Sequence, residues 1–249
     1  MDSYTAIAPL YDSLTADVDY SAFYAYLRRI LKRYRQTPRI VLDACCGTGS
    51  LTCLFAQDGY ETIGVDASFD MLSVARGKAD GLQNPPLFLH QPLHKLDLYG
   101  TVGFVFSSLD SINYIVDEKK LQKSFEKSSL FLEPGCLFVF DISSEHKLRS
   151  LNGQTIVKES EHCLCLWQSS YSERYRLATH LLDLFVPTDQ LGECYERYQE
   201  TQRQRAYDVY KLTEMLKKAG FCSVDVYGAF CFSAPKAEEQ RIFLVAKKA

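Results

Sequence analysis

Two carboxylates flank a glycine turn in the first third of this 249-residue chain, and they are the residues best placed for chemistry. Asp43 ends a short apolar run, and Asp66 ends the next such run roughly 20 residues later. Between them, Gly47 and Gly49 can adopt positive φ and let backbone N–H groups approach a ligand. Residues 50–58 are predicted to form a helix, whose N-terminus attracts an anionic group such as a carboxylate. The order of strand, glycine turn, helix, strand and acid predicts a nucleoside site at the carboxyl end of a parallel sheet.

The same residues restrict the kind of nucleoside. A carboxylate at Asp66 suits free ribose hydroxyls and would repel a phosphorylated ribose. Asp43 would repel a pyrophosphate but suits a cationic amine, and the third glycine of a dinucleotide fingerprint is missing from residues 50–52. A nicotinamide oxidoreductase is therefore disfavoured. S-adenosylmethionine combines an amine, a carboxylate and an unphosphorylated ribose, and it fits this pattern.

Residues 39–66 resemble motif I of the class I S-adenosylmethionine-dependent methyltransferases. Asp43, Gly47 and Gly49 match that motif, whereas Cys45 stands where its first glycine usually is. Three further segments resemble a bacterial branch of the family, with matches at Tyr11, Asp12, Asp19, Tyr20, Asp110, Ser111, Asn113, Tyr114, Glu200, Arg205 and Tyr207. Within the last segment, Gln202 replaces the histidine of the branch.

The resemblance implies a set of cofactor contacts. Asp43 would lie near the amino-acid end of the cofactor, Asp66 would hold the ribose, and Met71 would cover the adenine with its polarizable side chain. The family commonly has an acid where this chain has Pro92, so Gln91 or the backbone of Leu93 would have to contact the adenine amino group. The full predicted set is Tyr11, Tyr20, Asp43, Ala44, Cys45, Cys46, Gly47, Gly49, Asp66, Ala67, Met71, Gln91, Pro92, Leu93 and Ser108.

Catalysis of methyl transfer from a sulfonium depends mainly on placing the acceptor in line with the S–CH3 bond. Four residues are candidates for taking a proton from the acceptor: Asp110, Tyr114, His180 and Glu200. Each has a structural alternative. Asp110 could only shape a turn, and Tyr114 could only pack. His180 could be a histidine whose hydrogen bonds are satisfied by the protein, and Glu200 could belong to a surface ion pair. No metal site is expected, because Pro92 interrupts the spacing of His90 and His94.

Helices and strands alternate along most of the chain, which predicts an α/β fold with a doubly wound, Rossmann-like sheet. We expect seven mostly parallel strands, of which the last two form an antiparallel hairpin at residues 222–232 and 240–247. Pro134 and Gly135 are expected to close a helix over residues 117–132. Further helices are expected near residues 20–34, 50–58, 68–75 and 207–219, with strands near residues 40–42, 62–65, 87–89, 102–106 and 136–140.

Residues 153–206 have a different character, because their runs are long, half polar and rich in β-forming residues. We interpret them as an antiparallel β insert embedded in a single class I methyltransferase domain that spans residues 1–249. The resemblance implies that this insert forms part of a lid over the acceptor site. Trp167, Tyr171, Tyr175 and Tyr195 either line an apolar pocket or form the core of the insert.

Composition limits the partners. The net charge of −3 provides no basic field for nucleic acid, and no run of about 18 apolar residues predicts a membrane span. The N-terminus does not read as a signal peptide, and nine cysteines without metal spacing favour a reduced, cytoplasmic protein.

We therefore expect a methyltransferase that acts on a small-molecule acceptor. Methylation of RNA or protein is an alternative, for which a local basic patch would come from the helix containing Arg28, Arg29, Lys32, Arg33 and Arg35. A non-catalytic module that binds S-adenosylmethionine is the alternative from another class. Association of two copies through the insert is a further hypothesis.

Overall fold

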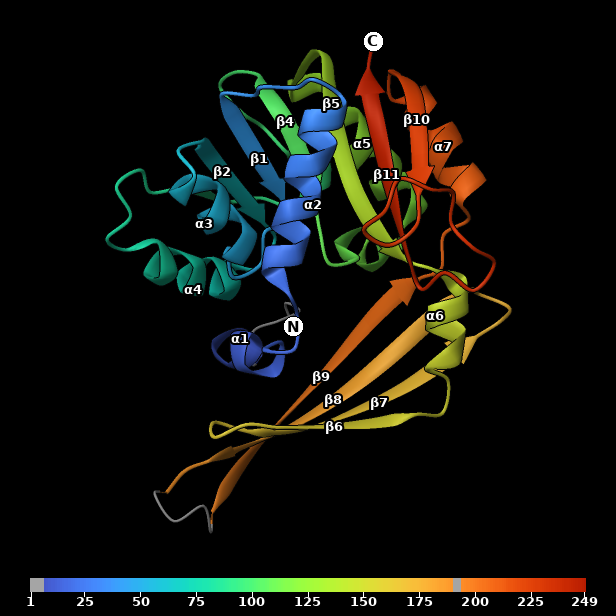
Figure 1. The fold of residues 1–249 in the computed structure, drawn as a ribbon. Helices are drawn as coiled ribbons and strands as arrows, with labels where there is room; N and C mark the ends of the chain where they lie inside the picture. The colour runs from blue at the N-terminus through green and yellow to red at the C-terminus, as the bar shows by residue number, and fades with distance from the viewer. Residues whose placement is uncertain (1–6, 190–193) are drawn as a thin grey trace.

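The computed structural model describes residues 7–189 and 194–249. Seven strands form one sheet in the order β10-β11-β5-β4-β1-β2-β3 (Figure 1). Strands β1 to β5 pair in parallel, whereas β11 is antiparallel to both β5 and β10. The predicted fold class is therefore confirmed. The strands are β1 (Ile40–Ala44), β2 (Glu61–Asp66), β3 (Leu87–His90), β4 (Val102–Ser107), β5 (Leu132–Ser143), β10 (Phe221–Tyr227) and β11 (Arg241–Lys248).

Helices cover both faces of this sheet. Successive residues of a strand point to opposite sides, and here both sides carry buried apolar residues that pack against helices. Val41 and Phe104 pack on the side of α2 and α3, whereas their neighbours Leu42 and Val105 pack on the side of α5 and α7. Figure 1 shows these two helical layers on opposite sides of the sheet. The helices are α2 (Tyr20–Arg33), α3 (Ser50–Gln57), α4 (Phe69–Ala79), α5 (Glu118–Phe131) and α7 (Val209–Lys218).

The starts of the helices follow local capping chemistry. The side chains of Asp19, Ser68, Asp117 and Asp208 accept hydrogen bonds from backbone N–H groups in the first turns of α2, α4, α5 and α7. Gly220 follows α7 with a φ of +99°, as expected for a residue just beyond a helix C-terminus.

Two predicted boundaries are wrong. Helix α5 ends at Phe131, and β5 begins at the next residue, so Pro134 and Gly135 lie within the strand rather than closing the helix. The pairing of β5 with β4 shifts register between the pairs Val102–Leu132 and Phe104–Leu137, which accommodates the proline in an irregular part of the strand. The penultimate strand ends at Tyr227, five residues earlier than the predicted boundary at residue 232.

A second, antiparallel sheet has the strand order β6-β7-β8-β9 and lies below the first sheet in Figure 1. Its strands are β6 (Thr155–Glu159), β7 (Leu164–Ser172), β8 (Leu177–Pro187) and β9 (Tyr195–Arg205). The chain enters this sheet through the short helix α6 (Glu145–Ser150) and leaves it towards α7. Cys165 and Leu182 on its buried side pack against Leu14 of the N-terminal segment, which contains η1 (Ala8–Leu10) and α1 (Tyr11–Leu14).

Two short 3-10 helices complete the edge of the first sheet that faces the second one. They are η2 (Leu93–Lys95), which follows β3, and η3 (Ser111–Tyr114), which follows β4. No helix within residues 7–189 and 194–249 combines the length and the apolar character needed to cross a bilayer.

The aromatic core between α3 and the sheet yields a stability prediction. Phe55 is fully buried and stacks on Phe106 with 5.0 Å between ring centroids. We expect Phe55→Ala to lower the free energy of unfolding by about 3–5 kcal/mol, because the surrounding rings cannot collapse fully into the space. Phe69→Ala is the matched control; that ring is 57% exposed, so a loss below about 1 kcal/mol is expected. Urea unfolding measures both variants, and equal losses would contradict the assigned core.

Candidate active site

The glycine turn after β1 folds back over the end of β2. The backbone N–H of Gly47 donates to Asp66 Oδ2 at 2.8 Å, and Gly49 begins α3 with a φ of +71°. Cys45 also has a positive φ, of +65°, a conformation that disfavours any residue with a Cβ by about 1–2 kcal/mol. This backbone conformation gives a physical reason for glycine at that position in related turns.

Both acids of the turn are buried. Asp43 is 3% exposed and accepts a hydrogen bond from the Thr52 hydroxyl at 2.6 Å. Burial raises the pKa of Asp43 to about 7, and the nearby charge of Asp66 acts in the same direction. Burial also raises the pKa of Asp66, although the N–H groups of Ser68 and Gly47 partly oppose the effect. A carboxylate has about four acceptor sites, so Asp66 retains acceptor capacity beyond these two bonds.

A cavity of about 990 Å3 opens between the glycine turn and the second sheet. Most of the predicted cofactor contacts line it, namely Tyr11, Tyr20, Asp43, Cys45, Cys46, Gly47, Asp66, Ala67, Met71, Pro92, Leu93 and Ser108. Ala44, Gly49 and Gln91 do not line the cavity. Ala44 is buried in the core, Gly49 lies against Phe88, and the Gln91 side chain bonds to the backbone N–H and carbonyl of Asp97. The Gln91 amide is thus bound within its own loop, whereas Leu93, the other candidate for the adenine contact, lines the cavity.

The N-terminal segment covers this cavity and is held from both sides. Asp12 accepts a hydrogen bond from the Thr48 hydroxyl at 2.7 Å and pairs with Lys78 at 2.7 Å. On the other side, Lys158 of β6 donates to the Leu14 carbonyl at 2.7 Å and pairs with Asp17 at 2.9 Å. The cover therefore connects the glycine turn to the second sheet.

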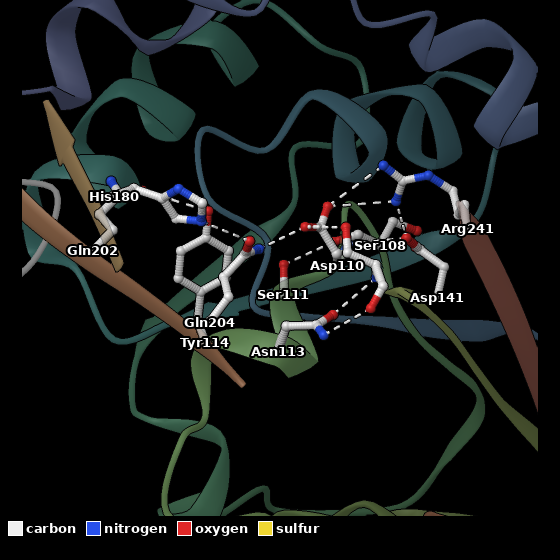
Figure 2. Close-up of polar contacts among 11 residues, drawn as sticks. Ser108, Asp110, Ser111, Asn113, Tyr114, Asp141, His180, Gln202, Gln204 and Arg241 are labelled. Carbon is white, nitrogen blue, oxygen red and sulfur yellow. Dashed lines mark hydrogen bonds and ion pairs between the residues drawn. The ribbon is translucent and has the colours of Figure 1, made fainter. Parts of the chain in front are cut away.

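A polar network beneath η3 joins the two sheets, as Figure 2 shows. Asp110 Oδ2 accepts from the Ser143 hydroxyl at 2.8 Å and from Gln204 Nε2 at 2.6 Å. Asp110 Oδ1 lies 3.4 Å from the Arg241 guanidinium, which also contacts the fully buried Asp141. Both oxygens of Asp110 are thus engaged by residues of β5, β9 and β11.

The network determines the charge of Asp110. Burial by itself would raise the pKa of Asp110, but the positive charges of Arg241 and Lys147 outweigh it and hold that pKa below its usual value. Asp110 is therefore ionised at neutral pH and binds the groups around it as an acceptor.

His180 extends the network to the wall of the cavity. Because the Asp110 carboxylate only accepts, the Gln204 amide presents its oxygen to His180, with 3.1 Å between Gln204 Oε1 and His180 Nε2. His180 Nε2 then carries the proton, and Nδ1 accepts from the Ser169 hydroxyl at 2.9 Å. Burial lowers the pKa of His180, which keeps the ring neutral. Both ring nitrogens are therefore engaged by protein groups.

The remaining two candidates for proton transfer lie along β9 and beside it. The Tyr114 hydroxyl lines the cavity and donates to Gln202 Oε1 across 3.4 Å, and Gln202 Nε2 donates to Glu200 Oε1 at 3.0 Å. Glu200 itself does not line the cavity. Figure 2 shows Tyr114 beside Gln202 and His180.

Sequence reasoning missed Arg241 and Gln204, and it did not resolve the role of Trp167. The signal for Gln204 is that β9 has polar side chains on its buried face, where apolar ones are usual; Gln202 and Gln204 are both buried. Trp167 lines the cavity, whereas Tyr175 and Tyr195 are 60% and 53% exposed and line neither the cavity nor a core.

Residues 41–135 match the family described as Methyltransferase domain. A relative from Geobacillus sp. (strain WCH70), named as a methyltransferase, is 31% identical over 248 residues, which cover 99% of this chain and 100% of the relative.

Solved structures share the fold over nearly the whole chain. The crystal structure of an S-adenosylmethionine-dependent methyltransferase from Clostridium acetobutylicum ATCC 824 has a TM-score of 0.86 at 27% identity and covers 99% of each chain. CalS10 from Micromonospora echinaspora, an amino pentose methyltransferase solved with S-adenosylmethionine bound, has a TM-score of 0.76 at 16% identity, covering 96% of this chain and 97% of its own.

The glycine turn yields a prediction with a matched pair of variants. A Cβ at Gly49 would lie 3.0 Å from Ala75 Cβ and 3.1 Å from the Phe88 ring, whereas a Cβ at Gly47 would meet nothing within 4 Å. Both positions have positive φ, so Gly47→Ala is expected to lose only about 1–2 kcal/mol of stability. Gly49→Ala is expected to lose about 1–3 kcal/mol more through crowding. Denaturant unfolding measures the free energy of unfolding of the two variants. Equal losses of stability would show that packing beneath the turn is loose.

Proposed function

The chain belongs to the class I S-adenosylmethionine-dependent methyltransferase family, and on this premise we propose that it methylates a small-molecule acceptor. The observation that carries the proposal is the cavity of about 990 Å3 beneath the N-terminal segment. Sites for small ligands usually have about 300–1,000 Å3, so this chamber suits a cofactor together with a small acceptor. The amino pentose substrate in the name of one structural neighbour supports the same class of acceptor.

The residues of the cavity fit the cofactor. Asp66 has acceptor capacity for the two ribose hydroxyls, and we propose that it binds them while its bonds to the glycine turn keep it in place. Asp43 is a buried carboxylate without a cationic partner among the described residues, and we propose that it faces the amine of the cofactor. Two acids this close would oppose a phosphate-bearing nucleotide.

S-adenosylmethionine supplies a methyl group on a sulfonium that needs no further activation. The task of this chain is then to hold the acceptor in line and to exclude water. Since the nitrogens of His180 and the oxygens of Asp110 bind protein groups, we propose that these two residues position the acceptor wall rather than remove a proton. Tyr114 contacts the acceptor directly, and Glu200 acts through Gln202.

The second sheet and the N-terminal segment together form the lid of the acceptor site in this proposal. Their support is the bond from Lys158 to the Leu14 carbonyl and the packing of Leu14 against β7 and β8. We also propose a cytoplasmic location, because the nine cysteines are all free thiols, which a reducing compartment preserves.

The proposed function is tested by following label from methyl-labelled S-adenosylmethionine into cell-extract fractions of small molecules, RNA and protein. We expect label in the small-molecule fraction, and loss of that label in Asp66→Ala, which also binds the cofactor at least about ten-fold more weakly through the lost ribose bonds. Asp80→Ala is the control, since Asp80 is exposed beyond α4 and does not line the cavity. Label in RNA or protein would replace the proposed acceptor class, and cofactor binding without transfer to any fraction would favour a binding module.

Asp43 gives cofactor binding a pH dependence. Its carboxyl is protonated below about pH 7 in the unliganded protein, and only the ionised form attracts an amine. We expect the affinity for S-adenosylmethionine to fall by up to about ten-fold per pH unit below that value, with release of a proton on binding. Calorimetry in buffers of different ionisation enthalpy measures both effects, and Asp43→Asn should remove them. Equal wild-type affinity at about pH 6 and about pH 8 would contradict the assignment.

Asp43 also gives the stability of the unliganded protein a pH dependence, which is opposite in direction to that of cofactor binding. An unfolded chain ionises its aspartates near pH 4, whereas folded Asp43 holds its proton to about pH 7. Asp43 therefore contributes stability that is present below about pH 4 and is lost as the pH rises towards 7. The wild type should lose more stability over this window than Asp43→Asn does, as measured by urea unfolding.

A further inference from the structure

Lys147 places an ammonium group at the cavity without a close ion-pair partner among the described residues. It lies on α6 and lines the cavity, and its backbone N–H is taken up by the Ser144 cap at 3.1 Å. The one acid on α6, Glu145, is already paired with Arg149 at 2.9 Å and with Arg176 at 2.5 Å. Within residues 7–189 and 194–249, Lys147 forms no ion pair.

The charge of Lys147 lies at the acceptor end of the cavity. Burial has the largest effect on the pKa values of Asp110 and His180, and the charge of Lys147 contributes to lowering both. Asp110 directly precedes η3, and His180 belongs to the second sheet. Lys147 lies on α6, the element that leads from the first sheet into the second, whereas Asp43 and Asp66 lie on β1 and β2 beside the glycine turn. We therefore assign the ammonium to the part of the cavity formed by Asp110 and His180 rather than to the proposed cofactor site.

The other charges at this end are already paired. Asp110 binds Arg241 and two neutral donors, and Asp17 pairs with Lys158. Arg203 also lies at the cavity, but its exposed side chain is on the opposite face of β9 from Gln202. In the register of the second sheet, Arg203 lies opposite Thr179 and Gln202 lies opposite His180. Among the described residues, the partly buried ammonium of Lys147 is thus better placed for an acceptor than the exposed guanidinium of Arg203.

We infer that the methyl acceptor carries an anionic group, a carboxylate or a phosphate, which Lys147 binds while the nucleophilic atom points towards the cofactor. The inference rests on the proposed function, since it concerns the acceptor of the same cavity. The cavity would then have two acids at its cofactor end and a cation at its acceptor end, so that an anionic acceptor enters in one orientation. Ion pairing and hydrogen bonding act together in such a contact, which makes it stronger than a bond between neutral groups.

Trp167 provides a direct readout, because it is the single tryptophan of the chain and it lines the cavity. The protein is first saturated with S-adenosylhomocysteine. Inorganic phosphate, benzoate and neutral benzamide are then titrated at constant ionic strength, which keeps screening equal between the arms. We expect saturable changes of tryptophan fluorescence with at least one of the two anions. Binding of phosphate alone identifies a phosphate-bearing acceptor, and binding of benzoate alone identifies a carboxylate.

The variant Lys147→Met keeps the aliphatic stem and removes the charge. We expect it to raise the half-saturating anion concentration about ten-fold, equivalent to about 1.4 kcal/mol, with little effect on benzamide. Lys123→Met is the matched control, since it removes the same charge from an exposed position of α5 outside the cavity. Unchanged anion binding in Lys147→Met, binding of benzamide as tight as that of the anion that binds, or no anion binding by the wild type would overturn the inference.

The titration also separates this inference from the proposed function. Binding of S-adenosylhomocysteine is measured first in both variants and should be unchanged, because Lys147 lies away from the cofactor acids. A protein that failed to bind this ligand would contradict the proposed cofactor site, and the anion titration of the unliganded protein would still report on Lys147. A protein that binds the cofactor but shows no dependence on Lys147 would contradict only the anionic acceptor.

Discussion

The arrangement of the site depends on one largely buried cation. Arg241, at the start of β11, is held between Asp110 and Asp141, and Asp110 in turn binds Gln204 of the second sheet. Removing one partner of such a buried pair strands the other charge away from water, at about 3–5 kcal/mol. The ion cluster therefore fixes η3 on the first sheet and fixes β9 against η3. The cavity lies between these two sheets, and residues of this junction line it.

The electrostatics of the cavity follow from which groups are paired and which are not. At the glycine turn, the two acids are buried, and burial raises the pKa of each. Their carboxyl groups favour a cationic or hydroxyl-bearing ligand there. At the opposite end, Asp110 is already neutralised by Arg241, and Lys147 is left facing the cavity. In our proposal, one chamber thus offers opposite charge to the cofactor and to the acceptor, which would orient both before any chemistry takes place.

Much of the fold and part of the site could be predicted from local sequence. The strand, glycine turn and acid pattern at residues 39–66 was found in the predicted order, and Asp43, Gly47 and Asp66 line the cavity, because turns, caps and apolar runs depend on neighbours in the chain. Prediction was wrong at Pro134 and Gly135, where a strand begins directly after a helix, because the pairing with β4 extends β5 over the proline. The bonds between the Gln91 side chain and the backbone of Asp97 were also not expected, because they form within a loop whose conformation no motif marks.

The sequence by itself therefore determined the fold class and the class of cofactor, and it predicts the end of the sheet for that cofactor, since all three depend on residues close together in the chain. Only the tertiary structure decided the roles at the acceptor end. Asp110, His180 and Gln204 come from three distant segments, and their protonation and hydrogen bonding are set by contacts with one another. The pairing of Glu145 with Arg176 is likewise a contact across 31 residues, and it is what leaves Lys147 facing the cavity. Such contacts depend on how the two sheets meet, a property that no local pattern encodes.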